Sequence, residues 1–275
     1  MMPPLSLAHL SFLDLPPPEF IQVAAEAGFA SVGLRLIAVT ETTPGYALMT
    51  DSQMMRDTLK ALKATGITVN DIEFVTLTPG FDAGSLDPFL ATGAELGAKY
   101  IITAPYDPDL RRMTENLDAF GARAASFGLS PVLEFFPWTN VPDFAAAMDI
   151  ATATGDPSIG VLLDTLHFDR SGSDLRDVAK AGKSRLPFIH LCDADVRPTY
   201  SEAELLHTAR AARLLPGEGG IALTEILALL PGDAGIALEI PQLAQPGRLP
   251  AEQRARRMYD VTQDYLNRAY EKLLN

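Results

Sequence analysis

The chain has 275 residues, of which 47% are hydrophobic and 21% charged, and its formal net charge is −13. This is the composition of a globular protein with a sizeable core, and so acidic a chain lacks the basic surface that a nucleic-acid partner requires. We therefore expect a small-molecule substrate and no nucleic-acid partner.

The sequence also indicates the compartment in which the protein is expected. A single cysteine, Cys192, excludes an internal disulfide and suits a reducing compartment. No segment approaches the ~20 apolar residues of a membrane span. The first residues lack the basic region and uninterrupted apolar run of a signal peptide. These features predict a cytoplasmic protein with no membrane partner.

Strand-like segments alternate with amphipathic helical segments along the chain. The predicted strands span residues 5–13, 31–37, 68–77, 99–105, 130–137, 159–166, 187–193 and 235–241. Four of the predicted helices end in a glycine that suits a helix C-cap: Gly28, Gly66, Gly97 and Gly128. Eight such units, with no G-x-G-x-x-G after the first strand, predict a single (β/α)8 TIM barrel over residues 1–275 rather than a doubly wound sheet.

One interval breaks the regular spacing of these units. Residues 194–220 form an extra segment between the seventh strand and the helix that follows it. Long loops in compact domains are commonly functional, so we predict an extended loop-helix insertion after strand 7 that covers the active site. Within it, His207, Arg210 and Arg213 lie three residues apart on nearly one helical face. They could hold an anionic group of the substrate, and a solvated basic face is the equal alternative.

The last four strands each carry a polar residue near the carboxyl end: Glu134, Asp164, His190 and Glu239. All strands of a barrel end at one face, where catalysis takes place. Three carboxylates and one imidazole in a partly dry cavity require a positive partner, and a divalent cation is the simplest. Mn²⁺, Mg²⁺, Co²⁺ and Zn²⁺ all suit such ligands. For any single acid, a helix cap or a strand-end salt bridge is the alternative.

Four segments, "LEFFPW", "LLDTLH", "FIHLCD" and "LEIP", resemble strand ends of the xylose isomerase-like TIM barrel superfamily. That group includes sugar isomerases and epimerases, inosose dehydratase, 3-dehydroshikimate dehydratase and endonuclease IV. The D-T-x-H element at 164–167 is most similar to the ketose 3-epimerase and dehydratase branches. The resemblance implies that Glu134, Asp164, His190 and Glu239 bind one divalent ion, with Mn²⁺ expected first. It also implies that His167 contacts substrate oxygens and that Glu134 and Glu239 flank the reacting carbon.

A metal that binds a carbonyl and its neighbouring hydroxyl acidifies the α-proton, so one glutamate can remove that proton and another can return it. We therefore expect an isomerase or epimerase that acts on a small sugar or keto-polyol through a metal-stabilised enediolate. A metal-dependent dehydratase of the 3-dehydroshikimate or inosose type is the alternative. A non-catalytic sugar-binding barrel is a further one, whereas four histidines and a strongly acidic chain disfavour a nuclease. The chain could form a homo-oligomer, either a dimer or a tetramer.

Other residues reach the same face of the predicted barrel. Arg35 at the end of the second strand and Glu73 in the third could bind substrate, or could pair with each other. Arg197 falls where epimerases of the family place a substrate-binding arginine. Phe136 and Trp138 could form an apolar wall against a sugar ring, or could simply pack the loop.

Overall fold

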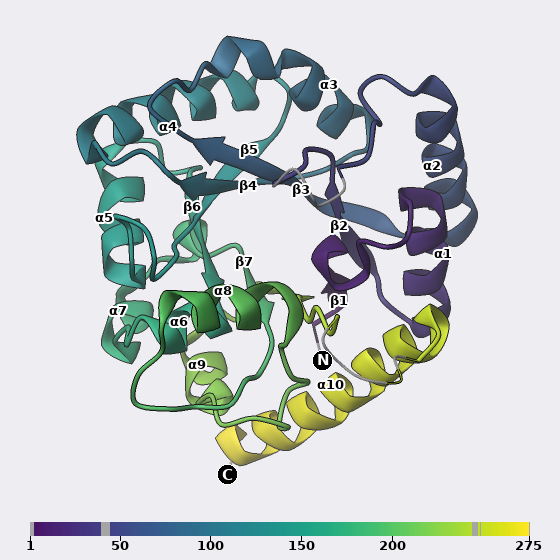
Figure 1. Cartoon of the computed structure of the whole chain (residues 1–275), viewed down its shortest axis with the longest axis vertical. Helices are drawn as coiled ribbons and strands as arrows, with labels where there is room; N and C mark the ends of the chain where they lie inside the picture. The colour runs from purple at the N-terminus through teal and green to yellow at the C-terminus, as the bar shows by residue number, and fades with distance from the viewer. Residues whose placement is uncertain (1–2, 40–44, 244–246, 248, 275) are drawn as a thin grey trace.

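The eight strands form one closed parallel barrel surrounded by helices (Figure 1). The computed structural model describes residues 3–39, 45–243, 247 and 249–274. Each strand pairs with its neighbours in the chain, and β8 pairs with β1 to close the ring. The predicted (β/α)8 architecture is confirmed. The strands are β1 Leu5–Leu7, β2 Ser31–Arg35, β3 Thr68–Leu77, β4 Tyr100–Pro105, β5 Ser130–Glu134, β6 Gly160–Asp164, β7 Phe188–Leu191 and β8 Gly235–Leu238.

The helices lie outside the barrel, apart from short segments at its ends. The α-helices are α1 Pro17–Ala27, α2 Ser52–Thr65, α3 Asp87–Glu95, α4 Leu110–Ala125, α5 Phe144–Ala153, α6 Thr165–Arg170, α7 Leu175–Lys180, α8 Glu202–Ala211, α9 Leu223–Leu229 and α10 Ala251–Leu274. The 3₁₀ segments are η1 His9–Phe12, η2 Ala83–Leu86 and η3 Lys183–Arg185. The four predicted glycine caps all have left-handed φ angles, between 72° and 103°. Within the described ranges, no helix has both the length and the apolarity of a membrane span.

The first strand is shorter than the sequence pattern predicts. The predicted strand runs over residues 5–13, but β1 ends at Leu7 and η1 follows at His9–Phe12. The reason lies in the neighbouring strand, because β8 itself ends at Leu238. The carbonyl of Leu238 accepts the N–H of Ala8, and beyond that point the N–H of Ser11 turns back to the Ala8 carbonyl. With no ladder partner left, the chain coils into a 3₁₀ turn.

The core has two parts, one inside the barrel and one between barrel and helices. The larger part fills the space beneath the helices, as expected for an α/β barrel. The smaller part lies inside the strands and includes Val132, Leu162, Phe188 and Ala237, all of which are buried. Each of these four residues precedes one of the predicted strand-end ligands by two positions. The alternation of a strand therefore puts the ligand on the same inner face, one layer nearer the mouth.

Candidate metal centre and active site

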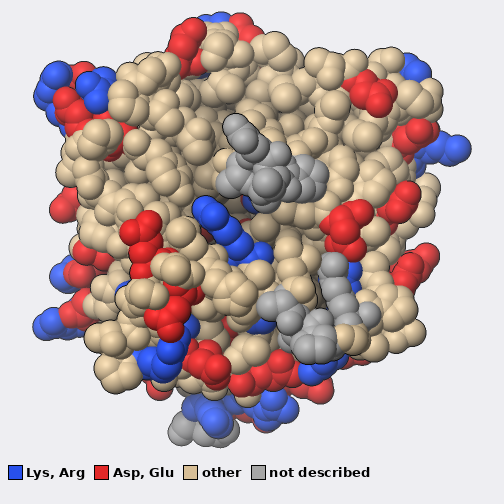
Figure 2. Space-filling model, viewed as in Figure 1, with Lys and Arg blue, Asp and Glu red and all other residues tan. Residues whose placement is uncertain are grey.

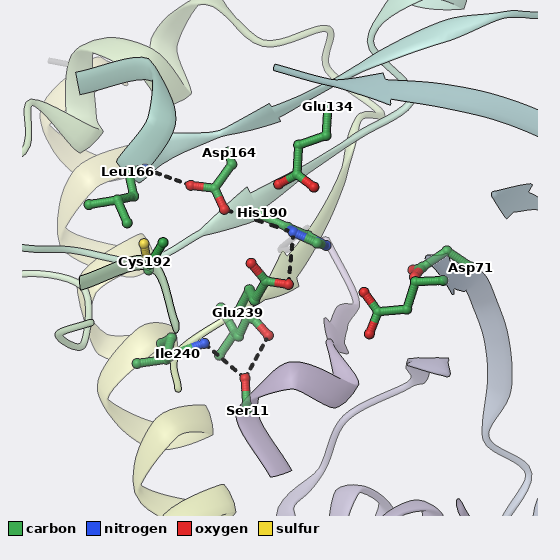
Figure 3. A network of polar contacts seen from close by, with 12 residues as sticks. Ser11, Asp71, Glu134, Asp164, Leu166, His190, Cys192, Glu239 and Ile240 are labelled. Atoms are coloured by element: carbon green, nitrogen blue, oxygen red, sulfur yellow. Dashed lines mark hydrogen bonds and ion pairs between the residues drawn. The ribbon is translucent and has the colours of Figure 1, made fainter. Parts of the chain in front are cut away.

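Four polar side chains converge where β5 to β8 end (Figure 3). Glu134 and Asp164 are the last residues of β5 and β6, His190 lies in β7, and Glu239 directly follows β8. One donor atom from each lies within 4.8 Å of the others, and no residue in the set is more than 4% exposed. The register of the sheet pairs Asp164 with His190 on adjacent strands. The structure thus brings together all four residues that the sequence predicts as ligands.

The donor set fits a divalent cation. Both ring nitrogens of His190 are buried without a hydrogen-bond partner, and Nδ1 lies 3.4 Å from Oε1 of Glu239. Burial, and then the charge of Glu239, raises the pKa of Glu134 well above its ordinary value. Burial lowers the pKa of His190, but the charge of Glu239 and its neighbours raises it to about 10. Both shifts favour the protonated forms of the two groups, which is the direction expected where negative charges are crowded without a cation.

Arg213 is the main departure from the sequence-based prediction. It was expected on a basic face of the insertion with His207 and Arg210, but α8 ends at Ala211 and the three side chains diverge. The His207 side chain is exposed, whereas Arg213 is 1% exposed. Its Nη1 lies 2.5 Å from Oδ2 of Asp164, and its Nη2 lies 2.7 Å from Oε2 of Glu239.

The charge of the cluster follows from these contacts. Within the described ranges, one guanidinium, that of the buried Arg213, forms ion pairs with carboxylates of the cluster, and the imidazole of His190 lies beside them. One fixed positive charge leaves two negative charges when all three carboxylates are ionised. A divalent cation would balance that remainder.

A cavity of about 240 Å³ opens above the cluster. One wall is aromatic and consists of Phe74, Tyr106, Phe136 and Trp138. The other predicted residues that line it are Arg35, Glu73, His167 and Arg210. In Figure 1, α8 lies in front of the barrel, and Figure 2 shows basic side chains near the centre of the same face with acidic ones around them. Ala209, Arg210 and Ala211 of the insertion therefore line part of the cavity, and its role as a cover stays a prediction.

His167 lies beside one of the four ligands. It is 2% exposed, and its Nε2 is 3.8 Å from Oε1 of Glu134. The edges of Phe136 and Trp138 pack against the ring, with centroids 4.8 and 5.2 Å away. Burial lowers the pKa of His167 to about 4, which makes it a neutral hydrogen-bonding group near pH 7.

Asp164 caps a helix with one carboxylate oxygen and presents the other to the candidate ligand cluster. Its Oδ1 accepts the backbone N–H groups of Leu166 and His167, at 2.7 and 3.2 Å, and so caps the N-terminus of α6. Its Oδ2 faces the ligand cluster and Arg213. The helix cap fixes the carboxylate plane and thereby orients the second oxygen toward the cluster.

Arg35 and Glu73 form a buried ion pair at the opposite side of the mouth. They are register partners in β2 and β3, and Nε of Arg35 lies 3.1 Å from Oε1 of Glu73. Both also line the cavity, so the pairing and the cavity lining that the sequence offered as alternatives coexist. Arg197 lies elsewhere: its side chain is 52% exposed and pairs with Glu204 at 3.0 Å.

Two further groups position the site and were missed by the sequence analysis. His9 is buried between the rings of Phe20 and Tyr46, and its Nδ1 accepts the backbone N–H of Arg35 at 3.0 Å. Ser11 Oγ accepts the N–H of Ile240 at 2.8 Å, directly after Glu239 (Figure 3). Both lie in the segment predicted as strand, where a 3₁₀ turn brings them inward.

A third missed group holds the insertion in place. Asp193, just after β7, accepts the backbone N–H groups of Gly217, Gly219 and Ile221 at 2.9 to 3.0 Å. Gly219 passes so close to this strand end that a Cβ there would lie 2.4 Å from the Ala194 carbonyl oxygen. The turn after α8 is thus fixed to β7, which keeps the chain that carries the buried arginine against the cluster.

A closed parallel barrel with a buried carboxylate-histidine cluster at its strand ends defines a TIM barrel with a candidate metal site at the usual catalytic face. Within that class, the chain belongs to the xylose isomerase-like TIM barrel family, whose model matches residues 21–263.

Among curated proteins, the chain is similar to inosose isomerases. The protein from Halalkalibacterium halodurans is 26% identical over 193 residues, which are 66% of this chain and 66% of that enzyme. The protein from Bacillus velezensis is 24% identical over 195 residues, which are 66% of this chain and 68% of that enzyme. The matched region thus spans about two thirds of these relatives.

Solved structures share the fold across nearly the whole chain. An IolI protein with a bound zinc atom aligns with a TM-score of 0.73 and 17% identity, over 99% of both chains. The probable 3-DHS dehydratase AsbF from Bacillus anthracis aligns with a TM-score of 0.72 and 16% identity, over 94% of this chain and 98% of that one.

Proposed function

We propose that this protein is a divalent-metal-dependent isomerase or epimerase of a small sugar or keto-polyol. The observation that carries the proposal is the convergence of four ligand atoms within 4.8 Å at the floor of a cavity. The similarity to inosose isomerases supports a polyol-derived ketone as the substrate. The proposal includes a cytoplasmic location and no nucleic-acid or membrane partner.

Glu134, Asp164, His190 and Glu239 would hold one divalent ion. Mn²⁺ is our first choice, with Mg²⁺, Co²⁺ and Zn²⁺ as alternatives, and the fold is shared with a zinc-containing IolI structure. When bound, such an ion polarises a substrate carbonyl and acidifies the neighbouring C–H group.

Two glutamates with different surroundings would carry the proton. Burial raises the pKa of Glu134, which has no cationic partner as close as that of Glu239. Burial also raises the pKa of Glu239, but the charges of His190 and Arg213 outweigh it and leave that pKa below its ordinary value. Paired carboxyls whose surroundings separate their pKa values suit a division into proton acceptor and proton donor.

The remaining cavity residues would bind the substrate. His167, Arg35 and Arg210 line the cavity together with the aromatic wall, and His167 packs against Phe136 and Trp138 of that wall. An aromatic wall packs against the C–H face of a ring, while the polar groups contact its oxygens. Proton return to the neighbouring carbon isomerises the substrate, whereas return to the other face of the same carbon epimerises it.

A dehydratase that acts on an inosose or on 3-dehydroshikimate is the second candidate. It shares the proton removal and then expels a β-hydroxyl group. Three arginines line the cavity of a strongly acidic protein, and two of them, Arg35 and Arg210, lie outside the ligand cluster and suit a substrate carboxylate. The fold shared with the probable 3-DHS dehydratase is compatible with this reaction.

The test is to incubate Mn²⁺-loaded protein with ketoses, an inosose and 3-dehydroshikimate in D₂O and to follow each by NMR after removal of the metal. Deuterium at the α-carbon with a new isomer supports the isomerase or epimerase. Loss of water to an enone supports the dehydratase. A protein that binds no divalent ion by elemental analysis and converts none of these compounds would overturn the proposal.

A further inference from the structure

A buried acid lies below the candidate metal centre, in a mostly apolar layer of the barrel. Asp71 lies in β3, two residues before Glu73, and is 1% exposed. The inner cluster at this level contains Ile102, Val132, Leu162, Phe188 and Ala237. A carboxyl group among such neighbours costs free energy unless a polar group interacts with it. The position therefore calls for a partner.

The barrel leaves room for this side chain at the neighbouring strand. A Cβ at Gly33 of β2 would lie only 2.4 Å from Oδ1 of Asp71, so the carboxylate occupies the space where another side chain would point. The amide Nδ2 of Asn70 donates to Oδ2 at 2.9 Å. Oδ1 has no hydrogen-bond partner. The acid is thus fixed in place with one oxygen free to accept.

The imidazole of His190 is another buried group of the barrel interior without a hydrogen-bond partner. Its Nδ1 faces the ligand cluster, 3.4 Å from Glu239 and 3.9 Å from Asp164. Its Nε2 is at the other side of the ring, buried and without a partner. Figure 3 shows Asp71 reaching toward that far side of the ring. Burial raises the pKa of Asp71 to about 7 and the charge of His190 opposes the rise, so the two groups interact electrostatically.

A metal-binding imidazole must be neutral, with one nitrogen as the ligand and the other carrying the proton. If Nδ1 of His190 is the ligand, Nε2 carries a hydrogen that needs an acceptor in a buried place. Ligating histidines commonly donate this hydrogen to a carboxylate, which fixes the tautomer and the ring orientation.

We propose that Asp71 is a positioning residue of the candidate metal centre: its free oxygen accepts the Nε2 hydrogen of His190 through one bridging water molecule, since the two atoms form no direct hydrogen bond. The acid thereby holds the tautomer in which Nδ1 faces the cation. The inference rests on the proposed metal-dependent function and adds a residue from β3 to a site whose ligands come from β5 to β8.

The experiment measures zinc affinity in two matched buried-acid variants. Asp71→Asn should raise the Kd for Zn²⁺ by ~10–100-fold, the loss typical of such acceptors. Asp107→Asn is the control, since Asp107 is equally buried and its Oδ1 pairs with Arg112 at 2.6 Å rather than with a ligand. It should lower stability and leave the Kd within about twofold.

A third variant moves the acid without removing it. Gly33→Ala pushes the Asp71 carboxylate away and should also weaken Zn²⁺ binding, which keeps the inference testable if Asp71→Asn does not fold. In ¹⁵N spectra of the zinc-loaded protein, the protonated Nε2 signal of His190 should shift in either variant. Unchanged Zn²⁺ affinity and an unchanged imidazole signal would overturn the inference. A wild-type protein that binds neither Zn²⁺ nor Mn²⁺, Mg²⁺ or Co²⁺ would instead overturn the proposed function.

Discussion

The two sides of the barrel mouth carry similar side chains but balance their charge differently. At the ends of β2 and β3, Arg35 and Glu73 form a buried pair at 3.1 Å, one positive charge for one negative. At the ends of β5 to β8, three carboxylates share the guanidinium of Arg213 and the imidazole of His190. An acidic residue at the end of a strand is therefore not enough, by itself, to indicate a metal site. The excess of negative charge on one side is what calls for a cation.

The largest expected effect comes from removing a ligand on the unbalanced side. Asp164→Ala deletes a proposed metal ligand, the cap of α6 and one of the two carboxylate partners of Arg213 at once. Removing one partner of a buried ion pair costs about 3–5 kcal/mol, and because Arg213 keeps its contact with Glu239, we expect the free energy of unfolding to fall by about 3 kcal/mol. Metal occupancy, measured by elemental analysis, should fall with it.

Asp174→Ala is the matched control for this variant. Asp174 also caps a six-residue helix, α7, through the N–H of Arg176 at 2.8 Å, but it lies outside the cluster. Its loss should cost about 1 kcal/mol and no metal. If Asp164→Ala were as mild as this control in denaturant titration, the cluster would not hold the charge balance that we describe.

The second effect is on turnover, and it compares Glu134 with Glu73, one glutamate from each side of the barrel mouth. Glu134→Gln should lower turnover by the ~10²–10⁴ of a lost general acid or base, while metal stays bound. Glu73→Gln leaves Arg35 without its partner, so it should lower stability and change KM, with metal occupancy as in the wild type. Steady-state kinetics together with elemental analysis separate the two variants.

Solvent-deuterium exchange distinguishes the roles of the two proposed catalytic glutamates, Glu134 and Glu239. Of Glu134→Gln and Glu239→Gln, one should block deuterium entry into the substrate and the other only delivery to the product. Wild-type turnover in a metal-bound variant of either residue would remove that residue from the mechanism.

The third effect is a pH dependence of the free energy of unfolding, on the side of the mouth where Arg35 and Glu73 form their pair. Burial lowers the pKa of His9 to about 3, below the 6.5 of an unperturbed histidine. Between these values the unfolded chain binds a proton that the folded protein does not. The contribution of neutral His9 is therefore complete above pH 6.5 and is lost as the pH falls, by about 1.4 kcal/mol per pH unit.

His9→Phe keeps a ring between Phe20 and Tyr46 but removes this titration. The free energy of unfolding of the variant should fall less steeply than that of the wild type from pH 6.5 to pH 4. Parallel profiles for the two proteins, measured by urea denaturation, would mean that His9 does not stay neutral in the fold.

The smallest effect concerns the insertion that lines part of the cavity. Arg210→Ala should raise KM by about 10-fold, as expected for one charge-assisted hydrogen bond to the substrate, without a change in metal occupancy. Arg111→Ala, an exposed arginine of α4 paired with Glu115, is the control. Hydrogen exchange across 194–220 should also slow when substrate binds. Unaltered KM and exchange would make the insertion a surface loop only.

Much of this site could be predicted because parallel barrel strands all end at one face. Glu134, Asp164, His190 and Glu239 occupy equivalent places in successive βα units, so the fold alone brings them together. His207 was predicted near the substrate from its spacing with Arg210 and Arg213, and Arg197 from the family resemblance. The structure places both residues outside the cavity lining. The position of a residue within an irregular insertion does not determine where its side chain lies relative to the barrel mouth.

The sequence by itself determined the alternation of strands and helices, the glycine caps and the identity of the strand-end donors, because these depend on local periodicity. Tertiary structure decided which groups surround those donors. Arg213 reaches Asp164 from a segment 49 residues further along the chain, and Asp71 faces His190 from across the barrel. Such contacts depend on barrel closure and on where α8 ends, and neither is encoded in the pattern of any single segment.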